Sequence, residues 1–254
     1  MQSLEAELAE ARALDVDELA DAIETIGFEC TRCGACCKSE AEDPHTATVF
    51  PDEVRRLQSA AQAPDPDRRH DDDTDTDADA DRDADGESAV ERDWRDVARP
   101  MPYGLTEGAD GPEGETFEWA LQTDACGDCV FYEEDADGVG ACGVHEDRPL
   151  ICETYPFSVA LGGTSQPMGE AVDEEGAVRA HECEGLGRDI DRADAESLAA
   201  ALKERAVREL TEAVGVRDSY EPRPADPGEV VVHDSEGAKD ADGRPLGPAD
   251  GTDR

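Results

Sequence analysis

The stretch that decides the fold is Cys30-Thr-Arg-Cys33-Gly-Ala-Cys36-Cys37, in which four cysteines fall within eight residues. Two residues separate Cys30 from Cys33, a spacing that lets both thiolates reach one ion. Gly34 tolerates a positive φ, which frees backbone N–H groups to point at sulfur. With Cys36, the stretch offers three thiolates from one loop. That arrangement is common for a [4Fe–4S] cluster and is also compatible with a four-thiolate zinc site.

The doublet of Cys36 and Cys37 raises a question of direction. Adjacent side chains in an extended chain point to opposite sides. We therefore expect these two thiols to serve two neighbouring sites, or one site and one free thiol.

The remaining cysteines lie in the second half of the chain, and Cys126-Gly-Asp-Cys129 is a second pair with the same spacing. No thioredoxin-like βαβ pattern surrounds this pair, so ligation is favoured over dithiol chemistry. The total of nine is odd, which excludes complete disulfide pairing within one chain. The sequence shows neither a secretory signal nor an apolar run approaching the ~20 residues of a membrane span. We expect a reducing cytoplasm, where such cysteines are typically metal ligands.

The charge is extreme, with 66 acidic against 23 basic residues and a net charge of -43. Acidic residues also stand between the apolar positions of well-formed helix patterns, which is typical of a folded protein adapted to high salt. Salt near 1 M shortens the screening length to about 3 Å and mutes self-repulsion. A halophilic prokaryotic source is therefore expected. The alternative is an ordinary acidic protein with disordered tails. Either way, the charge argues against nucleic acid and anionic membranes as partners.

Three segments carry helical patterns. Apolar residues recur at steps of three and four over 16–26, with Asp15 suited to the N-cap and Gly27 to the stop. A short helix is expected over 51–61, and a longer amphipathic one over 194–214.

Short strands are expected between these helices. Phe117, Trp119 and Leu121 alternate, which predicts a half-buried strand. The segment 130–144 resembles a hairpin with a cysteine near each end. Further short strands are expected at 157–163 paired with 176–181, and a lone strand at 229–233.

These elements predict a small, irregular, metal-stabilised α+β domain with short strands and flanking helices. From Pro64 to about Glu91 the chain is dominated by aspartate and can build no core. The expected parts are an N-terminal helical segment (1–27), one cysteine-cluster domain (28–62 and 116–216), a disordered acidic insertion (63–115) and a disordered acidic tail (217–254). Metal ligation would supply stability that the few large apolar residues cannot.

Three segments carry a resemblance: FECTRCGACC from residue 28, the long stretch from Cys129 to Phe157, and CEGLG from Cys183. They resemble the YkgJ-type cysteine-cluster family, also described as CxxCxxCC proteins, which are zinc- or iron-chelating or Fe–S proteins. The resemblance covers about residues 28–62 and 118–190. It implies these metal ligands: Cys30, Cys33, Cys36, Cys37, Cys129, Cys142, Cys152 and Cys183.

The chain departs from the family pattern in places. Glu153 stands where the family usually has Arg, and Cys126 is additional. Cys126 and His181 are secondary candidates for ligands, whereas His45 and His145 are better read as surface or packing residues.

A structural role is also expected for the dipeptide Arg148-Pro149. Pro149 can open a helical turn that carries Cys152, and Arg148 can donate hydrogen bonds to a thiolate or a carbonyl.

The favoured function is a metal-binding protein with one or two sites that hold an Fe–S cluster, foremost [4Fe–4S], or Zn²⁺. Its role would be redox chemistry or metal chelation. No histidine–carboxylate pattern of a hydrolytic zinc site is present. The alternatives are a cluster-dependent, methylase-like enzyme that modifies protein, and a zinc-scaffolded interaction module. A protein partner for redox or modification is conceivable in each case.

Overall fold

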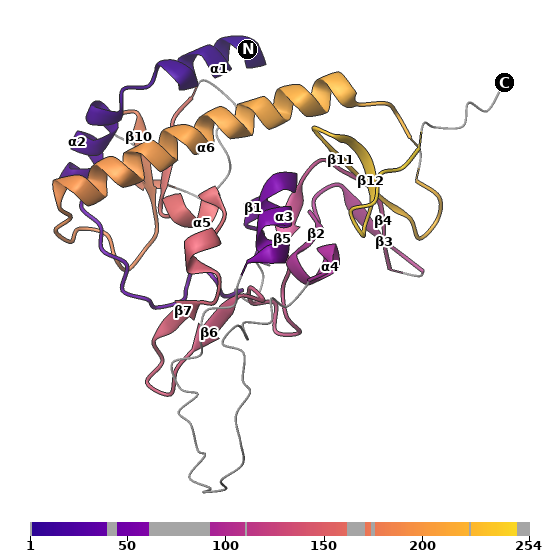
Figure 1. Cartoon of the computed structure of the whole chain (residues 1–254), viewed down its shortest axis with the longest axis horizontal. Helices are drawn as coiled ribbons and strands as arrows, with labels where there is room; N and C mark the ends of the chain where they lie inside the picture. Colours follow the sequence, from indigo (N-terminus) through magenta and orange to yellow (C-terminus); the bar gives the residue numbers. More distant parts are fainter. Residues whose placement is uncertain are drawn as a thin grey trace, which may run out of the picture.

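The computed structural model describes residues 2–39, 45–60, 92–109, 111–161, 171–173, 176–223 and 225–247. Helices and several small sheets alternate along these residues, so the predicted α+β class is confirmed (Figure 1). Residues 61–91, which include more than half of the expected insertion (63–115), lie outside the described residues, as do residues 248–254.

A long helix, α6 (Arg192–Ser219), crosses the molecule, with α1 (Leu4–Ala13) and α2 (Val16–Ile26) packed along it (Figure 1). The predicted caps of α2 are confirmed. The Asp15 carboxylate accepts hydrogen bonds from the first backbone N–H groups of the helix, and Gly27 ends it at a φ of 75°.

The first apolar core lies beneath these helices. It joins α2 and α6 to a three-stranded antiparallel sheet, and its members include Ile23, Phe157, Val178 and Leu202, all with almost no exposure. The sheet has the order β8 (Phe157–Val159), β10 (Val178–His181), β9 (Ala171–Asp173). The predicted pairing of segments 157–163 and 176–181 is thereby confirmed.

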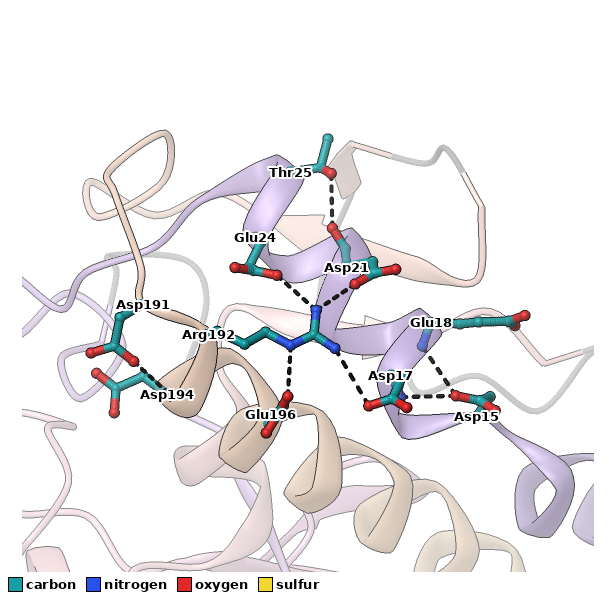
Figure 2. Close-up of polar contacts among 10 residues, drawn as sticks. All are labelled: Asp15, Asp17, Glu18, Asp21, Glu24, Thr25, Asp191, Arg192, Asp194 and Glu196. Atoms are coloured by element: carbon teal, nitrogen blue, oxygen red, sulfur yellow. Dashed lines mark hydrogen bonds and ion pairs between the residues drawn. The ribbon is translucent and has the colours of Figure 1, made fainter.

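Arg192, the first residue of α6, holds that helix to α2 (Figure 2). Its guanidinium donates to Asp21, to Glu24 at 2.8 Å and to Asp17 at 3.4 Å on α2, and to Glu196 at 2.7 Å on its own helix. One cation thus stands among four carboxylates.

A second core surrounds a sheet of order β1 (Thr48–Val49), β5 (Trp119–Leu121), β2 (Ala98–Pro100). The helices α3 (Pro51–Ser59) and α4 (Trp94–Val97) cover this sheet.

The strand predicted around Trp119 is the central one, but the expected half-burial was wrong. All three residues of β5 are buried, whereas Phe117 is 46% exposed and precedes the strand. A strand between two others, covered by helices, has no solvent face.

A four-stranded sheet corrects two predicted boundaries. Its order is β12 (Gly237–Asp240), β11 (Val230–Asp234), β4 (Gly111–Thr116), β3 (Leu105–Gly108), and β4 pairs with β11 in parallel. The acidic insertion therefore does not extend to residue 115, nor does the tail lack structure from 217.

The strand predicted at 229–233 exists, but it is not alone. Val231 and Val232 are fully buried, and this burial stabilises the sheet despite the acidic residues on either side. No helix in the described part of the chain is long and apolar enough to cross a membrane.

Candidate metal centre

The cysteine loop follows α2 and is held at its start by the segment after Cys183. Phe28 forms a bridge with Leu186, and Glu29 N–H donates to Gly185 O at 3.0 Å. A side chain on Gly185 would collide with the carbonyl oxygen of Glu29, so this close approach requires glycine. The pairing places the Cys30 end of the loop next to Cys183.

The loop then turns at Gly34, whose φ is 77°. Its carbonyl accepts from Cys37 N–H at 2.8 Å and Lys38 N–H at 3.1 Å, and the Tyr132 ring occupies the space that a Cβ on Gly34 would need. The Sγ atoms of Cys36 and Cys37 consequently lie 3.8 Å apart. The expectation that these thiols point to opposite sides was wrong, because this part of the chain is a turn and not extended.

Hydrogen bonds join the end of the loop to the segment that carries Cys129. Cys129 N–H donates to Cys37 O at 2.8 Å, and Ser39 N–H donates to the Asp128 carboxylate at 2.8 Å. Residues from opposite ends of the expected insertion therefore meet here.

The predicted hairpin is confirmed as β6 (Tyr132–Glu134) and β7 (Gly140–Cys142). Cys142 pairs with Tyr132, and Gly140 N–H donates to Arg32 O at 2.7 Å, which fastens the hairpin to the cysteine loop. The hairpin lies below α5 in the view of Figure 1.

Cys152 lies on α5 (Leu150–Thr154), a short helix that begins directly after Pro149, as predicted. A single 3-10 turn, η1 (His145–Asp147), connects β7 to this region. The thiols of Cys37, Cys142 and Cys152 pack against the second apolar core, of which Cys129 is a buried member.

The thiols influence one another electrostatically. The hydrogen bond with Cys37 lowers the pKa of Cys36 to about 7, and the same bond raises the pKa of Cys37. Burial raises the pKa of Cys129 to about 11 and that of Cys152 well above its usual value. Metal binding here must displace protons from buried thiols.

Cys183 belongs to the same neighbourhood as the start of the loop. Gly185 N–H donates to its sulfur at 3.4 Å. Burial raises the pKa of the Cys183 thiol, and the nearby charges of Cys33, Cys36 and Cys30 raise it further. Burial, with the charges of Cys183, Cys36 and Cys33, also raises the pKa of Tyr155, next to α5, to about 12.

Arg148 contributes positive charge near the thiols, as expected, and it acts on them electrostatically. Its guanidinium contacts the ring of His145. Burial raises the pKa of Cys142 and the charge of Arg148 opposes that rise, while for Cys36 the same charge adds to the lowering of the pKa caused mainly by the hydrogen bond with Cys37. The backbone carbonyl of Arg148 accepts from Arg56 at 3.0 Å. A fixed cation next to several thiolates offsets their mutual repulsion.

The secondary candidates have other surroundings. Cys126 is exposed, in a turn formed by the Asp124 carboxylate. His181 is buried, and its Nε2 lies 2.8 Å from Ser158 Oγ on the neighbouring strand. His45 is buried next to the backbone of Cys36, and burial lowers its pKa. His145 is exposed.

Glu53 is a positioning residue that sequence reasoning missed. Its buried carboxylate accepts from Phe50 N–H at 3.0 Å and from Leu150 N–H at 3.0 Å. The first bond is a capping box of α3, which Pro51 and the acidic residue two positions later could have indicated. The second joins α3 to the start of α5, which carries Cys152, and no local pattern predicts it.

Within the described residues, no three ligating side chains converge closely enough to hold a single ion as they stand. The donor set nonetheless fits zinc or iron, because cysteine thiolates are the soft ligands that both metals accept. Its members come from four separate segments: the loop, the hairpin region, α5 and the turn at Cys183.

Together, the fold and this collection of thiols define a small cysteine-rich domain of the metal-chelating class. The chain belongs to the CxxCxxCC family, described as a "putative zinc- or iron-chelating domain", whose sequence model matches residues 29–184. That span includes every cysteine of the chain. No curated protein and no solved structure matches the chain.

Proposed function

We propose that the protein is an iron–sulfur protein that serves in electron transfer or in metal chelation. The carrying observation is the loop from Cys30 to Cys37, which offers closely spaced thiols while Cys183 is held next to it by backbone pairing. Three cysteines from one loop with a fourth from a distant segment is a common ligand set of a [4Fe–4S] cluster.

The spread of the thiols supports a cluster over a single ion. They gather from four segments without converging on one point. A cluster of several iron and sulfide atoms spans a wider ligand set than one zinc ion does, so less movement would be needed to bind it.

The surroundings of the thiols supply what a redox centre requires of its protein. Gly185 N–H donates to the Cys183 sulfur, and Arg148 places positive charge near Cys36 and Cys142. Hydrogen bonds and charge next to sulfur tune the reduction potential of a bound cluster. Cys30 and Cys36 are exposed, so electrons could pass to a docked protein partner.

The charge of -43 also bears on partners and location. It disfavours contact with nucleic acid and with anionic lipid, which both require clustered Lys and Arg. A cytoplasmic protein partner with a basic surface fits this charge best.

The test is anaerobic purification of the full chain in high salt, followed by an absorbance spectrum and assays of iron, zinc and acid-labile sulfide on the same sample. Iron and sulfide in matching amounts, with broad visible absorbance, would support the proposal. A colourless sample that holds only zinc would overturn the iron–sulfur assignment and indicate a structural role. A sample without bound metal would overturn both the iron–sulfur assignment and a structural role for zinc.

A further inference from the structure

We propose that the cysteines form two adjacent four-thiolate centres. The first centre comprises Cys30, Cys33, Cys36 and Cys183, and the second comprises Cys37, Cys129, Cys142 and Cys152. This partition rests on the proposed metal-binding function of the thiols, and it holds for iron–sulfur clusters and for zinc alike.

Backbone pairing assembles the first centre. The segment 27–29 pairs with 185–187 through Glu29 N–H to Gly185 O and Gly187 N–H to Gly27 O, each at 3.0 Å. Cys30 and Cys183 directly flank this paired region. Cys33 and Cys36 lie close enough to Cys183 for their charges to act on its thiol. The first centre is therefore fixed by the same contacts that end α2.

A different set of contacts assembles the second centre. Cys129 N–H donates to Cys37 O at 2.8 Å, so these two residues are backbone neighbours. Gly143 N–H donates to Phe131 O at 2.8 Å, which folds Cys142 back beside Cys129. Cys152 joins them through α5, whose start is held by the buried Glu53 carboxylate.

The two apolar cores support the same division. Phe28 and Leu186, which frame the first centre, pack on the core of α2 and α6. All four thiols of the second centre belong to or pack on the core around Trp119. Cys37 packs on the second core, which places the boundary between Cys36 and Cys37. Their 3.8 Å separation makes the two centres direct neighbours, so the charge of Cys36 acts on Cys183 as well as on Cys142 and Cys152.

The two centres differ in access to solvent. In the first centre, Cys30 and Cys36 are exposed and Cys33 and Cys183 are half-buried, whereas every thiol of the second centre is buried or half-buried. A chelator reaches an exposed site faster than a buried one. Metal should therefore leave in two steps, the first centre losing its metal before the second.

The experiment measures the amount of metal per chain in the purified wild-type protein and in its cysteine-to-serine variants. Cys183→Ser and Cys142→Ser should each retain about half of the wild-type metal. The double variant Cys30→Ser/Cys183→Ser should retain the same half, because both changes affect one centre. The cross-centre variant Cys183→Ser/Cys142→Ser should retain none. Cys126→Ser, the matched control, should retain all.

Two results would overturn the partition. One is complete loss of metal from every single variant that remains folded by circular dichroism, which would indicate one shared centre. The other is complete loss in Cys30→Ser/Cys183→Ser while each single change leaves half. A wild-type chain that binds no metal would instead defeat the proposed function, which keeps the two failures distinguishable.

A second measurement uses the unmodified protein, in case variants fail to fold. The metal-loaded chain is treated with a chelator until half of the metal is released, and free thiols are then alkylated and identified by mass spectrometry. Alkylation of Cys30 and Cys183, with Cys142 and Cys152 still protected, supports the partition. Equal alkylation of all four overturns it.

Discussion

Lys239 Nζ lies 2.6 Å from Asp234 Oδ2 in the C-terminal hairpin, with side chains only 3% and 1% exposed. The same carboxylate oxygen accepts from Trp119 Nε1 at 2.9 Å. A buried ion pair thus fastens the acidic C-terminal segment to the central strand of the second core.

We predict that Lys239→Ala destabilises the protein by about 3 kcal/mol, because it leaves the Asp234 charge buried without its cation. Chemical denaturation, monitored by Trp fluorescence, measures this change. The matched control is Arg244→Ala, which removes a 73% exposed arginine paired with Asp242 and should cost less than about 1 kcal/mol. Equal losses in the two variants would contradict the prediction.

Glu53→Gln should lower the free energy of unfolding by about 1–3 kcal/mol, because a glutamine can accept only one of the two backbone hydrogen bonds without placing a donor against a donor. It should also reduce the metal bound near Cys152, since α5 loses its anchor. Urea denaturation and metal analysis measure the two effects. Asp52→Asn, at the neighbouring exposed position, serves as the control, and comparable effects there would rule out a special role for Glu53.

His45 predicts a pH dependence. Burial, with the charge of Arg99, lowers the pKa of His45 below 6.5, so the ring is neutral in the folded protein at pH values where the unfolded chain binds a proton. Its contribution to stability is complete above pH 6.5 and decreases as the pH falls toward the lowered pKa, by at most about 1.4 kcal/mol per pH unit.

The measurement compares melting temperatures of the wild type and His45→Gln at pH 7.5 and 5.5, both in metal-free protein. Groups other than His45 titrate alike in the two proteins, so the wild type should lose more stability on acidification than the variant does. Parallel pH profiles would show that His45 is not held neutral by the fold.

Arg192→Gln should lower the melting temperature more at low salt than at high salt. Removal of the guanidinium leaves Asp17, Asp21, Glu24 and Glu196 to repel one another (Figure 2). Ions near 1 M screen charges beyond about 3 Å and so weaken this repulsion. A salt series by calorimetry measures the difference.

Arg188→Gln is the matched control for Arg192. That guanidinium stands 3.9 Å from the single carboxylate of Glu29. The melting temperature of Arg188→Gln should therefore depend on salt concentration much as that of the wild type does. If Arg192→Gln lowered the melting temperature by the same amount at every salt concentration, packing rather than charge would explain the importance of this residue.

Local sequence patterns predicted the elements that depend on neighbouring residues. The caps Asp15 and Gly27, the hairpin of β6 and β7, and the amphipathic helix α6 all follow from spacing over a few residues. The four-stranded sheet could not be predicted from local spacing, because its parallel pair joins Val231 to Glu115 across more than a hundred residues. Its strands carry acidic residues and glycines that resemble a solvated linker.

The candidate site likewise combines features that local spacing predicted with features that depend on tertiary contacts. The spacing of Cys30, Cys33 and Cys36 indicated one chelating loop, and the structure places the start of that loop beside Cys183. The direction of Cys37 was mispredicted, because it depends on the turn at Gly34 and not on spacing. The link from Glu53 to α5 depends on a tertiary contact that no local pattern records.

The parallel pairing of β4 with β11 also sets an order of events during synthesis. The chain leaves the ribosome from its N-terminus, so Trp119 emerges long before Asp234 and Lys239 exist. The indole of Trp119 cannot reach its carboxylate partner until β11 has been translated. A nascent chain halted near residue 225 would therefore present an incompletely covered second core to chaperones and proteases.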